Sequence, residues 1–235
     1  MLKTSSAAVI GLVCLGLTAS VPSLAEDAKK AAPNAVGAGA AWSANVDSGS
    51  STLDEKQTSL IKTVNGYFND LKHLKGAFVQ TNPDKKRMKG KFYLKRPGKF
   101  RFDYALPSKQ IIISDGEYLA IQDLDLNNED RIALDQTPFR LVMRKDVDLL
   151  RDAKILDAQQ SEDLIVLTIQ DKDPNTPGRI KLFLATKPTV DLKEWVTTDA
   201  QSQETRVEIS DVNKTDDVDA GLFKIEAVGL QKDRP

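Results

Sequence analysis

The sequence contains little of the chemistry that most enzymes and metal sites use. It has one cysteine, Cys14, and one histidine, His73, among 235 residues. A single thiol cannot form an internal disulfide or a cysteine-based zinc site. The chain also has no Gly-x-Ser-x-Gly element, phosphate-binding loop or paired-histidine motif. We therefore predict a non-enzymatic protein with no catalytic residues, no metal and no cofactor.

Two features could still indicate proton or ion chemistry. A lone histidine beside an apolar helix stripe, such as His73, is most often solvated or half-buried. The segment Asp123–Asp130 alternates oxygen-bearing side chains, as calcium loops do. However, Asn128 stands where such a loop needs glycine, and Leu134 stands where it needs a bidentate glutamate. This segment is predicted to be a solvated hairpin tip.

Neither a dominant charge nor a long hydrophobic run is present. Lys and Arg number 33 against 34 Asp and Glu, so no basic field favours nucleic acid or an anionic membrane. The apolar run Ala7–Leu17 is shorter than the roughly 20 residues of a membrane span. Lys3 precedes it and Ser23-Leu24-Ala25 follows it. Residues 1–25 are therefore predicted to be a secretory signal.

We place the cleavage of this signal after Ala25, which would leave no thiol in the exported protein. The alternative is a lipidated Cys14, but Val13 before it is bulkier than the residue that lipoprotein peptidases prefer. Residues 26–52 are rich in Ala, Gly and Ser and are predicted to be a disordered arm. Residues 53–235 suit one domain with a sizeable core.

The domain is predicted to start with a long helix. Thr52 and Glu55 suit a capping box, and Gly76 closes a helix of about 22 residues. Its apolar residues form one stripe: Leu60, Ile61, Val64, Tyr67, Phe68, Leu71 and Leu74. From Ala77 onward the apolar period changes to two, which indicates strands.

The strands are predicted to form a long antiparallel meander. Pro97-Gly98 and residues 114–117 are the turns of two hairpins. Thr137-Pro138 begins a short helix. We predict an α+β fold, in which a curved antiparallel sheet forms an incomplete, half-open β-barrel that helices close. The predicted strands cover residues 90–95, 99–104, 111–113, 118–121, 131–134, 164–170, 179–185, 192–198, 204–211 and 222–227.

The first hairpin, Lys91–Tyr104, has one strongly apolar face. Its even positions are apolar and its odd positions mostly charged, which by itself also fits an ordinary half-buried sheet. Arg96 is an even-numbered position, so strand alternation places it on the apolar face. A guanidinium there must find acceptors or remain in water. It is either a solvated turn residue or a latch that bonds free carbonyls of a covering helix or loop.

Several ordered motifs resemble the outer-membrane lipoprotein carrier (LolA) family. They are Gly76-Ala77-Phe78-Val79-Gln80, the stretch from Gly90 to Phe102 with its Lys95-Arg96-Pro97, Ser114-Asp115-Gly116, Thr137-Pro138-Phe139 and Leu222-Phe223-Lys224-Ile225. The resemblance covers most of the chain from about Leu53 and is densest between Gly76 and Met143. The stretch 26–52 is longer than the family leads one to expect, and the part after Arg144 matches loosely.

The resemblance implies a periplasmic carrier with an aromatic-rich cavity. Such a carrier takes acylated lipoproteins from an inner-membrane ABC transporter and hands them to an outer-membrane acceptor or the outer membrane itself, acting as a monomer. Arg96 corresponds to the arginine that holds the helical lid shut, and Phe100 lies near the cavity mouth. Together with the alternation of apolar and charged residues in the strands, the resemblance predicts which side chains line the cavity. They are Phe78, Phe92, Leu94, Phe100, Phe102, Tyr104, Ile111, Ile113, Phe139 and Met143.

Two other functions remain open on the sequence alone. One is a periplasmic lipid-binding or sensor module of the same half-barrel fold with a different hydrophobic cargo. The other is an enzyme acting on lipid or cell-wall material, which the missing nucleophile and base disfavour. The sequence does not name the cargo.

Overall fold

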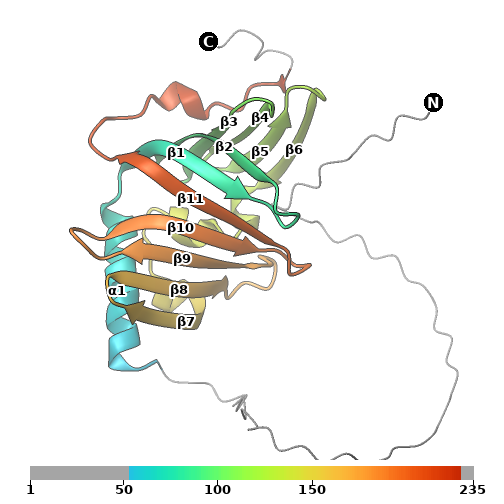
Figure 1. Ribbon diagram of the computed structural model, residues 1–235. Coiled ribbons are helices and arrows are strands. Elements are labelled where there is room, and N and C mark those ends of the chain that lie inside the picture. The colour runs from blue at the N-terminus through green and yellow to red at the C-terminus, as the bar shows by residue number, and fades with distance from the viewer. Residues whose placement is uncertain (1–52, 229–235) are drawn as a thin grey trace, which may run out of the picture. The chain divides into compact units, whose positions relative to one another are not determined.

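The fold is built on one curved antiparallel sheet (Figure 1). The computed structural model describes residues 53–228, so the predicted signal (1–25) and the predicted arm (26–52) lie outside the described residues. The 11 strands pair in the order β6-β5-β4-β3-β2-β1-β11-β10-β9-β8-β7. They are β1 (His73–Thr81), β2 (Arg87–Lys95), β3 (Lys99–Tyr104), β4 (Gln110–Asp115), β5 (Tyr118–Asp123), β6 (Asn128–Ala133), β7 (Ala153–Ser161), β8 (Leu164–Asp171), β9 (Arg179–Ala185), β10 (Asp191–Thr198) and β11 (Glu204–Asn213).

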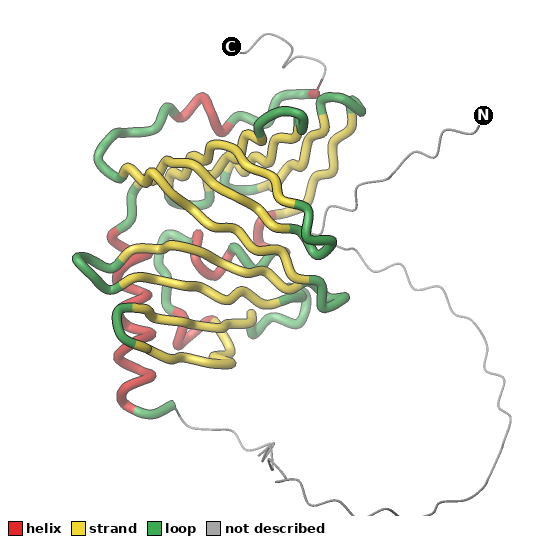
Figure 2. Tube along the Cα trace, viewed as in Figure 1, coloured by secondary structure: helices red, strands yellow, loops and turns green. Residues whose placement is uncertain are grey.

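The strand order consists of two meanders, β1 to β6 and β7 to β11, which meet where β1 pairs with β11. Within the described residues, the outermost strands β6 and β7 do not pair with each other, so the sheet is open. Figure 2 shows a long helix along the strand ends and short helices in the hollow of the sheet. The predicted α+β fold with a half-open barrel is confirmed.

The long helix is α1 (Glu55–Asp70), which is shorter than predicted. Its capping box is formed by Asp54 and Gln57 rather than by Thr52 and Glu55. It ends before Leu71, and His73 already belongs to β1, where it pairs with Lys95. The buried stripe of the helix is Leu60, Ile61, Val64 and Phe68.

Both predicted hairpin turns are present, and they touch each other. Gly98 has a φ of 70°, and a Cβ there would lie 2.7 Å from the Cα of Gly116. Only glycine fits a position that combines a left-handed backbone with this close approach. The β2–β3 and β4–β5 turns are therefore fixed against one another at one end of the sheet.

Other predicted elements differ from the structure. The short helix α2 covers only Arg140–Met143, and the Thr137 hydroxyl donates to the Leu134 carbonyl instead of capping it. A further helix, α3 (Leu149–Asp152), and strand β7 were not predicted. The predicted last strand, 222–227, is wrong, because this segment begins as the 3-10 helix η2 (Ala220–Phe223) and pairs with no strand.

The described part of the chain has no helix that is long and apolar enough to cross a membrane.

Candidate functional site

The inner face of the sheet carries a cluster of aromatic side chains. Directly opposed residues share a face, and β2 and β3 oppose Phe92 to Phe102 and Leu94 to Phe100. The Phe78 ring lies 5.0 Å from the Phe102 ring in an edge-to-face contact. A Cβ at Gly90 would lie only 2.7 Å from the Phe78 ring, so this glycine leaves the space that the ring occupies. The pairing register of β2 with β3 and the absence of a side chain at Gly90 therefore fix the positions of the aromatic rings.

The opposite wall comes from the second meander and the helices. Trp195 of β10 places its ring 6.0 Å from Phe102, and Phe139 lies 5.8 Å from Phe100. Together these groups enclose a cavity of about 60 Å³ in which every lining side chain is apolar. They are Phe68, Leu94, Phe100, Phe102, Phe139, Val142, Met143, Ile180, Leu182, Leu192 and Trp195.

The cavity is narrow in this structure, with α2 lying over it. Its volume of about 60 Å³ is far below the roughly 300–1,000 Å³ of usual ligand sites. A long acyl chain cannot fit into this space unless the helices or side chains that cover it move. The site is therefore an apolar core with a small gap, and its capacity depends on whether its cover can open.

Polar side chains lie beyond the aromatic cluster on the same inner face. The buried Tyr104 hydroxyl donates to Gln80 Oε1 at 2.5 Å, and Gln80 Nε2 donates to Asn82 at 2.7 Å. Burial raises the pKa of Tyr104, although the hydrogen bond to Gln80 opposes this shift. These hydrogen bonds satisfy buried polar groups and make this part of the inner face unsuitable for an acyl chain.

The structure places the predicted site residues in three groups. Leu94, Phe100, Phe102, Phe139 and Met143 line the cavity. A second group, Phe78, Phe92 and Tyr104, is buried on the same face in the aromatic cluster. The third group is Ile111 and Ile113.

The assignment of Ile111 and Ile113 to the cavity is wrong. They oppose Asp103 and Arg101 in the ladder, so they lie on the outer face, while Ile112 opposes Phe102 on the inner face. Both are buried nonetheless, because η2 packs on β3 and β4 and brings the buried Phe223 to this side.

The outer face contains a buried arginine as well. Arg101, on the charged side of the first hairpin, is only 5% exposed. Its Nε donates to Asp103 at 2.7 Å and its Nη1 to the Leu222 carbonyl at 3.2 Å. The segment after β11 therefore covers this face and uses Arg101 as an attachment point.

Sequence reasoning missed the cavity residues that come from α1, β9 and β10. Phe68 was placed on the helix stripe but not in the cavity. Ile180, Leu182, Leu192 and Trp195 lie in strands that were predicted. The spacing of two between Ile180 and Leu182 was a signal that could have assigned them to one face, whereas a register shift between Leu192 and Glu194 interrupts the alternation in β10.

Arg96 connects the sheet to the covering helix. Its Nη1 donates to the Val142 carbonyl at 2.9 Å, and its Nη2 donates to the Arg144 carbonyl. These carbonyls lie at the end of α2, where the helix leaves acceptors unused. Gly98 adds a backbone bond to the Met143 carbonyl at 2.9 Å. Partial burial lowers the pKa of Arg96, but a guanidinium keeps its charge.

A second arginine fixes the other side of α2. Arg140 forms a two-pronged ion pair with the buried Asp171 of β8, with N···O distances of 2.5 and 2.7 Å. Burial alone would raise the pKa of Asp171, but hydrogen bonds from Arg140 and from the Asp173 amide lower it below its ordinary value. The helix over the cavity is thus held by charged groups on both sides.

This combination defines a class of protein: an open half-barrel whose curved sheet and helices enclose an apolar cavity. Within residues 53–228, no cluster of His, Cys, Asp and Glu side chains could hold a metal ion. The chain belongs to the outer membrane lipoprotein carrier protein LolA family, whose model matches residues 69–226.

Two relatives in sequence agree with this assignment. The chain is 27% identical over 184 residues to an outer-membrane lipoprotein carrier protein of Halorhodospira halophila, covering 74% of this chain and 85% of the relative. It is 28% identical over 144 residues to one of Chromohalobacter salexigens, covering 58% and 66%. Among solved structures, a LolA superfamily protein of Nitrosomonas europaea matches with a TM-score of 0.38 and 12% identity, covering 71% of this chain and 98% of that one.

Proposed function

We propose that this protein carries lipoproteins through the periplasm by taking their acyl chains into the apolar cavity under α1 and α2. The observation that carries this proposal is a wholly apolar cavity, lined in part by α2, in a member of the lipoprotein carrier family. Residues 1–25 would direct export and be removed after Ala25. The cargo would come from an inner-membrane ABC transporter and pass to an outer-membrane acceptor or to the membrane itself.

The energetics suit a carrier that uses no chemical step. Each CH₂ group removed from water contributes about 0.8 kcal/mol, so one 16-carbon acyl chain in water costs on the order of 10 kcal/mol. Each hydrogen bond that Arg96 donates contributes about 1.5–3 kcal/mol. Acyl burial can therefore displace the cover, while the bonds still close the empty protein.

In this proposal, the closed structure is the empty form and the loaded form is open. Arg96 and its two carbonyl acceptors act as the lid latch. Leu94, Phe100, Phe102, Phe139 and Met143 contact the chains first, because they already line the gap. Phe78, Phe92 and Tyr104 form the rigid wall behind them.

The test is site-specific photo-crosslinking in the periplasm. A photoreactive residue in place of Phe102 should capture acylated protein, because Phe102 lines the cavity. The same residue in place of the exposed Lys91, on the neighbouring strand but the opposite face, should not. Native mass spectrometry of the purified protein identifies the cargo. Free lipid alone would favour the lipid-binding module, and capture at neither position would contradict a carrier.

A further inference from the structure

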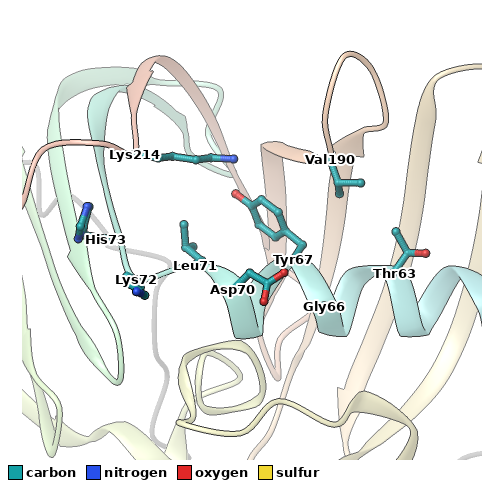
Figure 3. Close-up of a pocket in the computed structure, with 9 residues that line it drawn as sticks. All are labelled: Thr63, Gly66, Tyr67, Asp70, Leu71, Lys72, His73, Val190 and Lys214. Atoms are coloured by element: carbon teal, nitrogen blue, oxygen red, sulfur yellow. The ribbon is translucent and has the colours of Figure 1, made fainter.

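A second pocket lies against another side of α1 (Figure 3). It has a volume of about 520 Å³, which is in the usual range of about 300–1,000 Å³ for ligand sites. Apolar surface comes from Tyr67, Leu71 and Val190, and the polar or charged lining residues are Thr63, Asp70, Lys72, His73 and Lys214. This pocket is separate from the apolar cavity, and the proposed function gives it no role.

The side of α1 that faces the pocket consists partly of residues that weaken a helix. Thr63, Gly66 and Asp70 follow each other at spacings of three and four, so they lie on one face. Glycine is the poorest helix former after proline, and threonine is also poor. Asp70 places a negative charge in the last turn, where the helix dipole disfavours it and no basic residue compensates.

Packing within the described chain does not explain Gly66. A Cβ at this position would meet no atom within 4 Å, so alanine would fit and would favour the helix. Gly90 is different, because a Cβ there would lie 2.0 Å from a backbone oxygen. Gly66 leaves the helix backbone accessible from the pocket, which is the arrangement of a site that another backbone approaches closely.

Two basic side chains that line the pocket already have acidic partners. Lys214 pairs with Asp191, and its ammonium lies 4.9 Å from the centre of the Tyr67 ring. Figure 3 shows the Tyr67 and Lys214 side chains pointing toward each other. His73 faces Asp217 at 3.7 Å. These pairs leave no excess of positive charge such as a phosphate site would present.

Two further charged groups are available to a ligand. The side chains of Asp70 and Lys72 are exposed and have no hydrogen bond or ion pair with other residues of the range 53–228. A carboxylate accepts hydrogen bonds only, and an ammonium donates them only. The pair suits a neutral ligand that presents both N–H and C=O groups, as a polypeptide backbone does.

The pocket adjoins the apolar cavity along the chain. Phe68 and Leu192 line the cavity, while Tyr67 and Val190, one and two residues earlier, line the pocket. The rings of Tyr67 and Phe68 are 5.2 Å apart. A molecule whose acyl chains passed between α1 and β10 would leave its polar end beside this pocket.

We propose that the pocket binds the first residues of the cargo polypeptide, directly after its acylated terminus. The inference rests on the proposed function, since acyl chains would fill the cavity while the folded cargo stays outside. The connecting residues would then lie as an extended chain against Gly66 and the Tyr67 ring. Asp70 would accept from their N–H groups, and Lys72 would donate to their carbonyls.

The test compares two synthetic probes with the purified protein. One is a triacylated cysteine amide, and the other is the same compound extended by an uncharged hexapeptide. The unaltered protein should bind the extended probe about 10-fold more tightly, as expected for two charge-assisted hydrogen bonds to partly solvated groups. Asp70→Ala with Lys72→Ala should abolish this preference and leave the affinity for the amide unchanged.

The variant Gly66→Ala distinguishes a binding role of Gly66 from a structural one, because the two roles predict opposite effects on stability and on peptide binding. It should raise the melting temperature by about 2–4 °C, because alanine favours the helix, and still reduce the preference for the extended probe at least threefold. Lys62→Ala is the matched control, since Lys62 is exposed on α1 and does not line the pocket.

The outcomes separate the two proposals. If the amide does not bind, the carrier function fails and this inference fails with it. If both probes bind equally well, the carrier function stands and the pocket proposal is wrong. If vesicle-derived phosphatidylethanolamine binds with the same dependence on Asp70 and Lys72, the pocket is a headgroup site and the proposal is overturned.

Discussion

Arg96 joins the β2–β3 turn to the carbonyls at the end of α2. Its position follows from strand parity, since the residue before the turn continues the inner face of β2. Its guanidinium is partly buried, and its two donors match two acceptors that the short helix leaves unused. The contact is strong because the Arg96 guanidinium is charged and planar, so that two of its N–H groups can donate to two carbonyls at once.

We expect Arg96→Leu to favour the open or loaded state. The change removes the donors and keeps an apolar stem, so cargo should still be accepted while its release to outer-membrane vesicles slows. Arg96→Lys should restore release only in part, because one ammonium does not reproduce the fork. Transfer from purified, loaded protein measures this. If the Leu variant shows normal transfer and normal stability, Arg96 is only a turn residue.

The three consecutive isoleucines of β4 show where sequence reasoning fails at this scale. Alternation identified the inner face of the first hairpin, because charged residues marked the other face. Ile111, Ile112 and Ile113 are all apolar, so no alternation of apolar and polar residues indicates which of them face the inner side of the sheet. Only the pairing with β3 sets it, and it selects Ile112. The family resemblance did not correct this error.

At the level of elements, the strands were predictable where one face is buried and the other solvated. β7 was missed because it is mostly polar and a register shift between Ile155 and Asp157 interrupts its alternation. The segment 222–227 has the composition of a strand, but it lies across the outer face, and side chains of Arg101 and Gln122 bond its carbonyls. The end of α1 was missed because its apolar spacing continues into β1.

The element α2 should loosen in acid through its contact with Asp171. The pKa of Asp171 is lower in the folded than in the unfolded protein, so the contact contributes its full stability above the unfolded value of about 3.9. That stability is lost as the pH falls through the lower, folded pKa. Proteolytic cleavage near α2, measured between pH 6 and pH 3, should therefore increase below about pH 4.

The variant Asp171→Asn isolates this effect. It should make α2 sensitive to cleavage already at pH 6 and flatten the increase at low pH, because the carboxylate is gone. Asp163→Asn, which affects only the exposed pair of Asp163 with Lys187, is the control and should behave like the unaltered protein. An unchanged acid profile in Asp171→Asn would mean that other carboxylates set it.

Across the whole molecule, the first meander is covered on both faces. The helices and the second meander cover its inner face, and the segment after β11 covers its outer face. Phe223 is 2% exposed on that outer side, and Lys95 reaches Asp217 at 2.9 Å to hold the segment at one end. The outer cover contributes to stability without contacting the cavity.

Phe223→Ala should therefore separate stability from cargo binding. Truncating a buried phenylalanine costs about 3–5 kcal/mol, so the urea midpoint should fall markedly. The identity of the cargo captured at Phe102 should not change. Lys224→Ala, an exposed neighbour, should alter the free energy of unfolding by less than about 0.5 kcal/mol. A change of cargo in Phe223→Ala would show that the two faces are coupled.

The pairing of β1 with β11 also has a consequence for the order of export. These strands come from the two ends of the described chain, with Lys75 opposite Asn213. A chain that enters the periplasm with its N-terminus first leaves β1 with a neighbour on one side only until β11 arrives. Until then Phe78 lacks Ile209, its partner across the ladder. The inner face of the sheet is thus complete only when β11, the last strand of the described residues, has paired with β1 and joined the two meanders.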